Sequence, residues 1–171
     1  MMKRIFLLWA FALVCLMGNA QSLSVYISDS NGEFTNVRNA PGGKVVAKIP
    51  TSKIVMLEVT SPQNGWWQID GGTVNYTGDD DEEVTLKGSS TGYWIHHSVI
   101  AVGTRNYGGE TLHLRKSPDN KSAAVFSFKE EMQLRPLEVR GDWVKVKTAD
   151  GKHTGWIESE WLCDNPLTNC C

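Results

Sequence analysis

The chain has 171 residues with a nearly balanced charge: 17 basic and 19 acidic residues give a net charge of −2. This balance argues against a nucleic-acid-binding protein, which normally carries a basic face. It also gives no reason to expect an anionic membrane surface as the partner.

Residues 1–20 have the pattern of an export signal that is removed from the mature protein. Lys3 and Arg4 precede an apolar run of 12 residues at 5–16, and Gly18 and Ala20 supply the small residues that a signal peptidase reads. A membrane-spanning helix needs about 20 apolar residues. We therefore predict cleavage after Ala20, a secreted or periplasmic location and no stable membrane span in the mature chain.

Two other interpretations of this leader are less favoured. A retained N-terminal anchor conflicts with the short apolar run. A lipid anchor on Cys15 would need small residues where Leu13 and Val14 stand. Because Lys3 and Arg4 leave with the leader, 15 basic residues remain against 19 acidic ones.

The chain after the leader is poor in helix signals and rich in short alternating runs. Gly, Pro, Asn and Asp interrupt it about every ten residues, and such spacing of four- to eight-residue runs favours an all-β barrel or sandwich. The predicted strands lie at residues 45–49, 54–59, 66–69 and 93–95, then at 124–128, 132–139, 143–147 and 155–157.

An acidic run occupies residues 79–83, and its flanks at 74–77 and 84–87 alternate. The alternation predicts a hairpin with the acidic run at its tip. A solvated tip is preferred to a calcium site, because the run lacks the spacing and central glycine of a calcium loop. Calcium binding at this hairpin is left open.

The two halves of the chain repeat each other. Residues 36–41 (Asn-Val-Arg-Asn-Ala-Pro) reappear at 113–118 (His-Leu-Arg-Lys-Ser-Pro), and the strand at 66–69 reappears at 143–146. A third match joins residues 92–95 to 154–157, so the first copy has about 15 extra residues. A repeat of this size predicts two tandem modules, each with its own core.

The repeated motifs resemble the bacterial SH3-like domain found in exported and cell-wall proteins. The order is Val-Arg-x-x-Pro, an apolar strand, Gly-x-Trp-x-x-Val and Gly-Trp-Ile, and the second copy fits best. The resemblance implies two small SH3-like barrels. We divide the chain into a signal peptide at 1–20, a first barrel at 21–102 with an acidic insert at about 71–90, a second barrel at 103–162 and a tail at 163–171.

Strand alternation separates the predicted core from a second, partly covered face. The predicted core residues are Val144, Val146, Ile157 and Leu162 in the second copy, with Ile69 and Ile95 in the first. Off that face lie aromatic side chains, whose flat rings suit sugars and extended peptides. The candidate ligand-binding residues are Trp66, Tyr93 and Trp143, with Arg38, Arg115 and His96 as weaker polar candidates.

Structural roles compete with binding for the polar candidates. The preferred interpretation of Arg38 and Arg115 is that each packs its stem on the barrel and bonds loop carbonyls. His96 and His97 are neighbours, and on a strand their side chains would point to opposite faces, so they would not easily hold one metal ion. No metal site, cofactor or catalytic residue is predicted.

The cysteines after the leader all lie near the C-terminus. Cys163 could form a disulfide with Cys170 or Cys171, which export would permit. Three cysteines leave the pairing open.

These features predict a non-catalytic exported binding module. The resemblance implies peptidoglycan peptide or glycan, or an exported protein, as the partner. The alternative is a structural or scaffold module that binds a protein and no small ligand. Neither the ligand nor the oligomeric state follows from the sequence.

Overall fold

The computed structural model describes residues 21–77 and 81–167. The predicted signal peptide, Asp79, Asp80, Cys170 and Cys171 lie outside these residues. No α-helix occurs in the described ranges, and the fold is all-β, as predicted.

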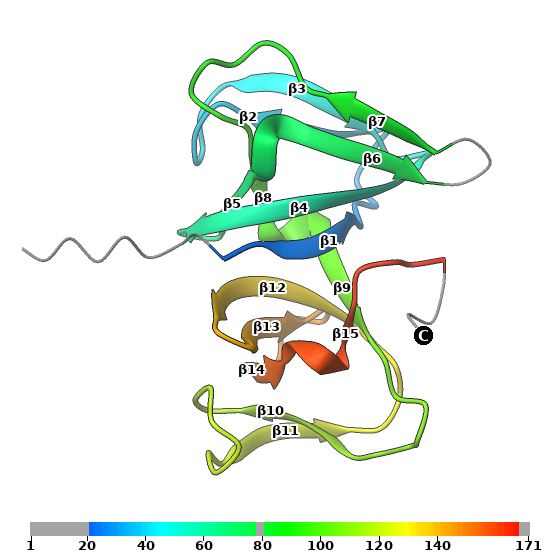
Figure 1. The fold of residues 1–171 in the computed structure, drawn as a ribbon, viewed down its shortest axis with the longest axis vertical. Helices are drawn as coiled ribbons and strands as arrows, with labels where there is room; N and C mark the ends of the chain where they lie inside the picture. The colour runs from blue at the N-terminus through cyan, green and yellow to red at the C-terminus, as the bar shows by residue number, and fades with distance from the viewer. Residues whose placement is uncertain (1–20, 78–80, 168–171) are drawn as a thin grey trace, which may run out of the picture.

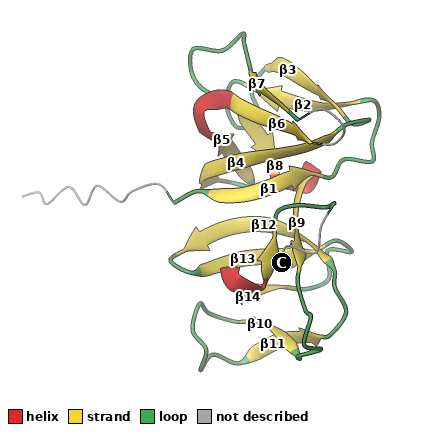
Figure 2. Cartoon of the chain, turned by 45° about the vertical axis from the view of Figure 1, so that its right-hand side comes forward, coloured by secondary structure: helices red, strands yellow, loops and turns green. Residues whose placement is uncertain are grey.

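Strands make up most of both halves of the molecule (Figures 1 and 2). Three short 3-10 helices interrupt them: η1 (Asp70–Gly72), η2 (His97–Val99) and η3 (Ser159–Trp161). The strands of the first half are β1 (Leu23–Ile27), β2 (Phe34–Arg38), β3 (Val45–Pro50), β4 (Ile54–Gln63), β5 (Trp66–Ile69), β6 (Thr73–Thr77), β7 (Glu82–Thr85) and β8 (Trp94–His96). Then follow β9 (Ile100–Thr104), β10 (Leu112–Arg115), β11 (Ala124–Phe128), β12 (Gln133–Arg140), β13 (Trp143–Thr148), β14 (Thr154–Glu158) and β15 (Leu162–Cys163).

The sequence repeat is matched by a repeat of strand pairings. In the first half β2 pairs with β3 and β8, and β5 pairs with β4 and β8. In the second half β10 pairs with β11 and β14, and β13 pairs with β12 and β14. The registers also agree, since Trp67 lies opposite Ile95 as Val144 lies opposite Ile157.

Strand β9 joins the two halves. It pairs with β1 through Ile100 and Ala101, and with β12 through Val102 and Gly103. Its end also pairs with β15. Figure 1 shows β9 running from the upper half into the lower one. The predicted boundary between residues 102 and 103 falls inside this strand, and the division into two separate barrels stays a prediction.

The hairpin expected in the first half is present. Strand β6 pairs with β7, with Val74 opposite Val84, and β6 also pairs with β4. Glu82 and Glu83 belong to β7, so part of the acidic run is strand and not loop. The hairpin covers an edge of β4, and Val74 is fully buried there.

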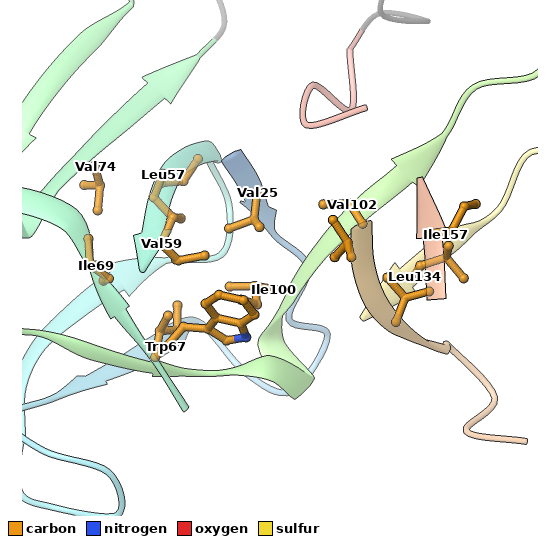
Figure 3. Packing of buried hydrophobic residues seen from close by; sticks show 14 of the residues in the cluster. Val25, Leu57, Val59, Trp67, Ile69, Val74, Ile100, Val102, Leu134 and Ile157 are labelled. Carbon is orange, nitrogen blue, oxygen red and sulfur yellow. The ribbon is translucent and has the colours of Figure 1, made fainter. Parts of the chain in front are cut away.

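The buried side chains form a single hydrophobic cluster with members from both halves (Figure 3). Five of the six predicted core residues are at most 2% exposed: Val144, Val146, Ile157, Ile69 and Ile95. The sixth, Leu162, is only partly buried and packs against the cluster. Alternation therefore assigned the inward face of β5, β8, β13 and β14 correctly.

Replacing Val146 with alanine is expected to lower the free energy of unfolding by about 1–3 kcal/mol, because a fully buried side chain is lost and a cavity is left. Lys145→Ala, on the opposite face of the same strand, should cost far less. Urea denaturation of both variants measures the difference. Equal losses would show that the register of β13 is wrong.

Polar contacts also cross between the halves. The indole Nε1 of Trp67 donates to the Pro136 carbonyl of β12 at 3.0 Å, and Trp67 is fully buried. Arg135 donates to the carbonyls of Ser28 and Ile100 at 3.0 and 2.9 Å. These bonds satisfy buried or half-buried backbone groups, so they fix how one half sits on the other.

Candidate functional site

Each half presents one outward face of its sheet at equivalent positions. On the first, Trp66 pairs with His96, and Trp94 lies opposite both Gln68 and Arg38. On the second, Trp143 pairs with Glu158, and Trp156 lies opposite both Lys145 and Arg115. We define the first face as Arg38, Trp66, Trp94 and His96, and the second face as Arg115, Trp143, Trp156 and Glu158.

The first face brings three of the candidate residues together. The guanidinium carbon of Arg38 lies 5.7 Å from the ring centroid of Trp66, and the Trp66 and His96 rings meet edge-to-face at 5.0 Å. Trp66 is only partly buried. An accessible indole with a cation and an imidazole beside it can stack against a flat or extended ligand.

The second face brings Trp143 and Arg115 together. Both line a cavity of about 200 Å³ that Asn120, Glu158 and Trp161 also line. Asn120 donates to the carboxylate of Glu158 at 2.7 Å. This cavity is small for a whole ligand but is suited to one side chain or one sugar substituent.

The remaining aromatic residue of the second face is buried. Trp156 is 5% exposed, and its ring lies 5.0 Å from the guanidinium of Arg140 and 5.8 Å from the ammonium of Lys145. Arg140 and Lys145 therefore cover Trp156, and Trp143 is the accessible indole of the second face.

Both arginines have the structural role preferred from the sequence. Arg38 donates to the Gly43 carbonyl at 2.6 Å, and Arg115 donates to the Ser122 carbonyl at 2.9 Å. Each bond closes the turn that follows its strand. The repeated arginine is thus explained by the turn, and its charge is an additional property of the face.

Tyr93 is not brought to the first face. It lies just before β8, and its side chain packs against the hydrophobic cluster. Its hydroxyl donates to the Leu86 carbonyl at 2.8 Å and accepts from the Ser89 amide at 3.3 Å. The second copy has Gly155 here, where a Cβ atom would lie 2.8 Å from the Cβ of Leu114. Tyr93 thus anchors the inserted segment.

The two histidines are arranged differently from the sequence expectation. The strand ends at His96, and His97 begins η2, so their ring centroids are only 4.4 Å apart. The expectation of opposite faces was wrong because it assumed a continuing strand. Their contact was not predicted. Gly65 leaves room for it, since a Cβ atom at this residue would lie 3.0 Å from His97.

The pKa of His97 is lowered to about 4, mainly by burial and in addition by the nearby His96, Lys147 and Arg135. Its Nδ1 is buried without a hydrogen-bond partner in the described part of the chain. Burial also lowers the pKa of His96. His97 is therefore neutral in the folded protein at neutral pH.

The folded protein should lose stability as the pH falls from about 6.5 toward 4. In this window the unfolded chain binds a proton at His97 and the folded chain does not, so acid favours unfolding. Urea denaturation at pH 7.5 and pH 5 measures the loss. His97→Asn should reduce the difference between the two pH values, and an unchanged difference would contradict the assignment.

No group of three or more His, Cys, Asp or Glu residues in the described ranges is placed to hold a metal ion. Cys163 is 7% exposed, and its sulfur lies 3.4 Å from the Asn165 carbonyl oxygen. Its predicted partners are outside the described residues, so the disulfide stays a prediction.

None of the described helices has the length and apolar character needed to cross a membrane.

No curated protein matches the chain. Among solved structures, the chain is similar to "Structure of NlpC2 from Trichomonas vaginalis" at 9% identity and a TM-score of 0.30, covering 85% of this chain and 49% of that chain. It is also similar to "Structure of NlpC1 from Trichomonas vaginalis" at 10% identity and a TM-score of 0.30, covering 84% of this chain and 46% of that chain.

The chain thus spans about half the length of each of these two structures. Similarity at this TM-score supports no statement about activity. A family model is more informative: the one described as bacterial SH3 domain matches residues 110–162. These residues hold β10 to β14, the start of β15 and the whole second face. The match therefore supports an SH3-like family for this all-β chain.

Proposed function

We propose that the chain is a non-catalytic, exported module that binds cell-wall material, through peptide or glycan. The observation that carries the proposal is a partly exposed tryptophan at the same place in both halves, Trp66 and Trp143, beside an arginine fixed by its turn. Exposed aromatic rings on a rigid sheet suit sugar rings and extended peptides.

Two further observations support this proposal. Bacterial SH3 domains are typically extracytoplasmic and often bind cell-wall material, and the leader has the pattern of an export signal. The polar side chains of the faces are also engaged in structural bonds, since Arg38, Arg115 and Glu158 each bond a neighbouring turn or loop. Polar groups held in place in this way can contact a ligand without taking part in a reaction, which fits a binding role.

Co-sedimentation of the chain from Gln21 onward with purified peptidoglycan tests the proposal. The protein should move to the pellet in a saturable way, and isolated wall fragments should compete. Failure to sediment at high protein concentration would overturn the proposal and favour the scaffold alternative, in which the sheet faces bind an exported protein.

A further inference from the structure

The surface around η3 in the second half is hollowed into three adjoining cavities of about 200, 450 and 430 Å³. Trp161 lines the first and second, Glu158 the first and third, and Glu160 the second and third. The three cavities therefore adjoin one another at the residues of η3 and its neighbour Glu158. The helix η3 is the red turn beside β13 and β14 in Figure 2. We call the adjoining cavities the η3 groove.

Aromatic rings stand along the η3 groove. Tyr107 is 55% exposed, and Trp143 and Trp161 are partly exposed. Trp143 lines the first cavity, Trp161 the first two, and Tyr107 the second. Rings spaced along a groove suit an extended chain, which can place successive groups against them.

The charge of the η3 groove indicates which kind of peptide is complementary to it. Four carboxylates line it: Glu110, Asp142, Glu158 and Glu160. The cations in it are fewer and are held by backbone: Arg105 donates through Nε to the Glu160 carbonyl, and Arg115 donates to the Ser122 carbonyl. The net charge of the groove is therefore negative, and a cationic ligand is complementary to it.

The first half has no such groove chemistry at the equivalent positions. Where the second half has Asp142, Glu158 and Glu160, the first has Gly65, His96 and Ser98. Where the second has Trp161, the first has Val99. Two faces built on the same strand pairings thus differ in charge and in aromatic content, so they do not offer the same site twice.

We propose that the η3 groove binds an extended peptide segment that carries Lys or Arg side chains, and that the first face does not. The aromatic rings contact the backbone and the aliphatic stems of such a segment, and the four carboxylates attract its cationic ends. The inference rests on the proposed binding function and narrows the ligand of one of the two faces.

A direct test uses the chain from Gln21 onward and an acetylated, amidated (Gly-Lys)3 hexapeptide, with (Gly-Glu)3 as the charge-reversed probe. The indole N–H signals of the tryptophans are followed by NMR during titration. We expect the signals of Trp143 and Trp161 to shift with (Gly-Lys)3 while that of Trp66 stays in place. Added salt should weaken binding, because exposed charges are screened.

Variants test the role of charge. Glu158→Gln and Glu160→Gln keep side-chain size, and each should weaken (Gly-Lys)3 binding about two- to fivefold, as expected for exposed ion pairs. Glu33→Gln is the matched control, since Glu33 is exposed and lies outside the groove. Equal binding of (Gly-Glu)3, or Glu-to-Gln variants that bind like the control, would overturn the inference.

The outcomes separate this inference from the proposed function. A protein that sediments with peptidoglycan but does not bind (Gly-Lys)3 retains the proposed function and loses the inference. A protein that binds (Gly-Lys)3 at Trp143 and Trp161 but ignores peptidoglycan retains the inference and loses the wall as its target.

Discussion

Replacing Trp67 with alanine is expected to lower the free energy of unfolding by about 3–5 kcal/mol, the range seen when a buried aromatic residue is truncated. Trp67 is fully buried in the shared cluster, and its N–H satisfies the Pro136 carbonyl of the other half. The variant loses packing and leaves that carbonyl without its partner. Urea denaturation followed by circular dichroism measures the effect.

Two companion variants make this result interpretable. Trp67→Phe retains an aromatic ring and removes the hydrogen bond, so it should cost less than Trp67→Ala. Trp66→Ala, next to it on the chain but on the outer side of the sheet, should cost much less than either. A Trp67→Ala variant as stable as Trp66→Ala would show that the contact between the halves does not exist in solution.

Trp66→Ala and Trp143→Ala should each weaken binding to peptidoglycan by about 30-fold, which corresponds to a hot-spot contribution of about 2 kcal/mol. Both side chains are partly exposed, so each ring is available to a ligand and contributes less to packing than Trp67 does. Pull-down with purified peptidoglycan measures binding, and thermal unfolding checks that the fold persists.

Each outcome of these two substitutions has a distinct meaning. Lost binding with a nearly unchanged melting temperature supports the faces as binding sites. If the melting temperature falls as far as in Trp67→Ala, these indoles are core residues and the ligand binds elsewhere. Lys53→Ala serves as the control for an exposed position outside both faces.

The sequence predicted the sheet well where alternation was regular. Strand β5 has the predicted bounds, and β13 differs from its prediction by one residue. Period-two alternation is a local signal, so it also identified Val144 and Val146 as buried. It did not reveal β9, whose significance lies in pairing with strands from both halves.

The candidate site was predicted less completely, because side-chain neighbours depend on where a strand ends. Trp66, Arg38 and His96 were all named as candidates, and their side chains lie together in the structure. Tyr93 was also named but does not join them, because the inserted hairpin gives it a partner at Leu86 that no repeat position suggests. The groove around η3 also depends on a loop and a turn that meet only in the folded chain.

The continuous strand β9 fixes the distance between the first and second faces, and this distance affects which ligands can occupy both. Because no flexible linker separates the two faces, their spacing is set by backbone hydrogen bonds and not by chain entropy. The effective concentration of the second face, once the first is occupied, then depends on the length and stiffness of the ligand. The protein would therefore favour polymers in which the distance between two binding groups matches the fixed distance between its two faces.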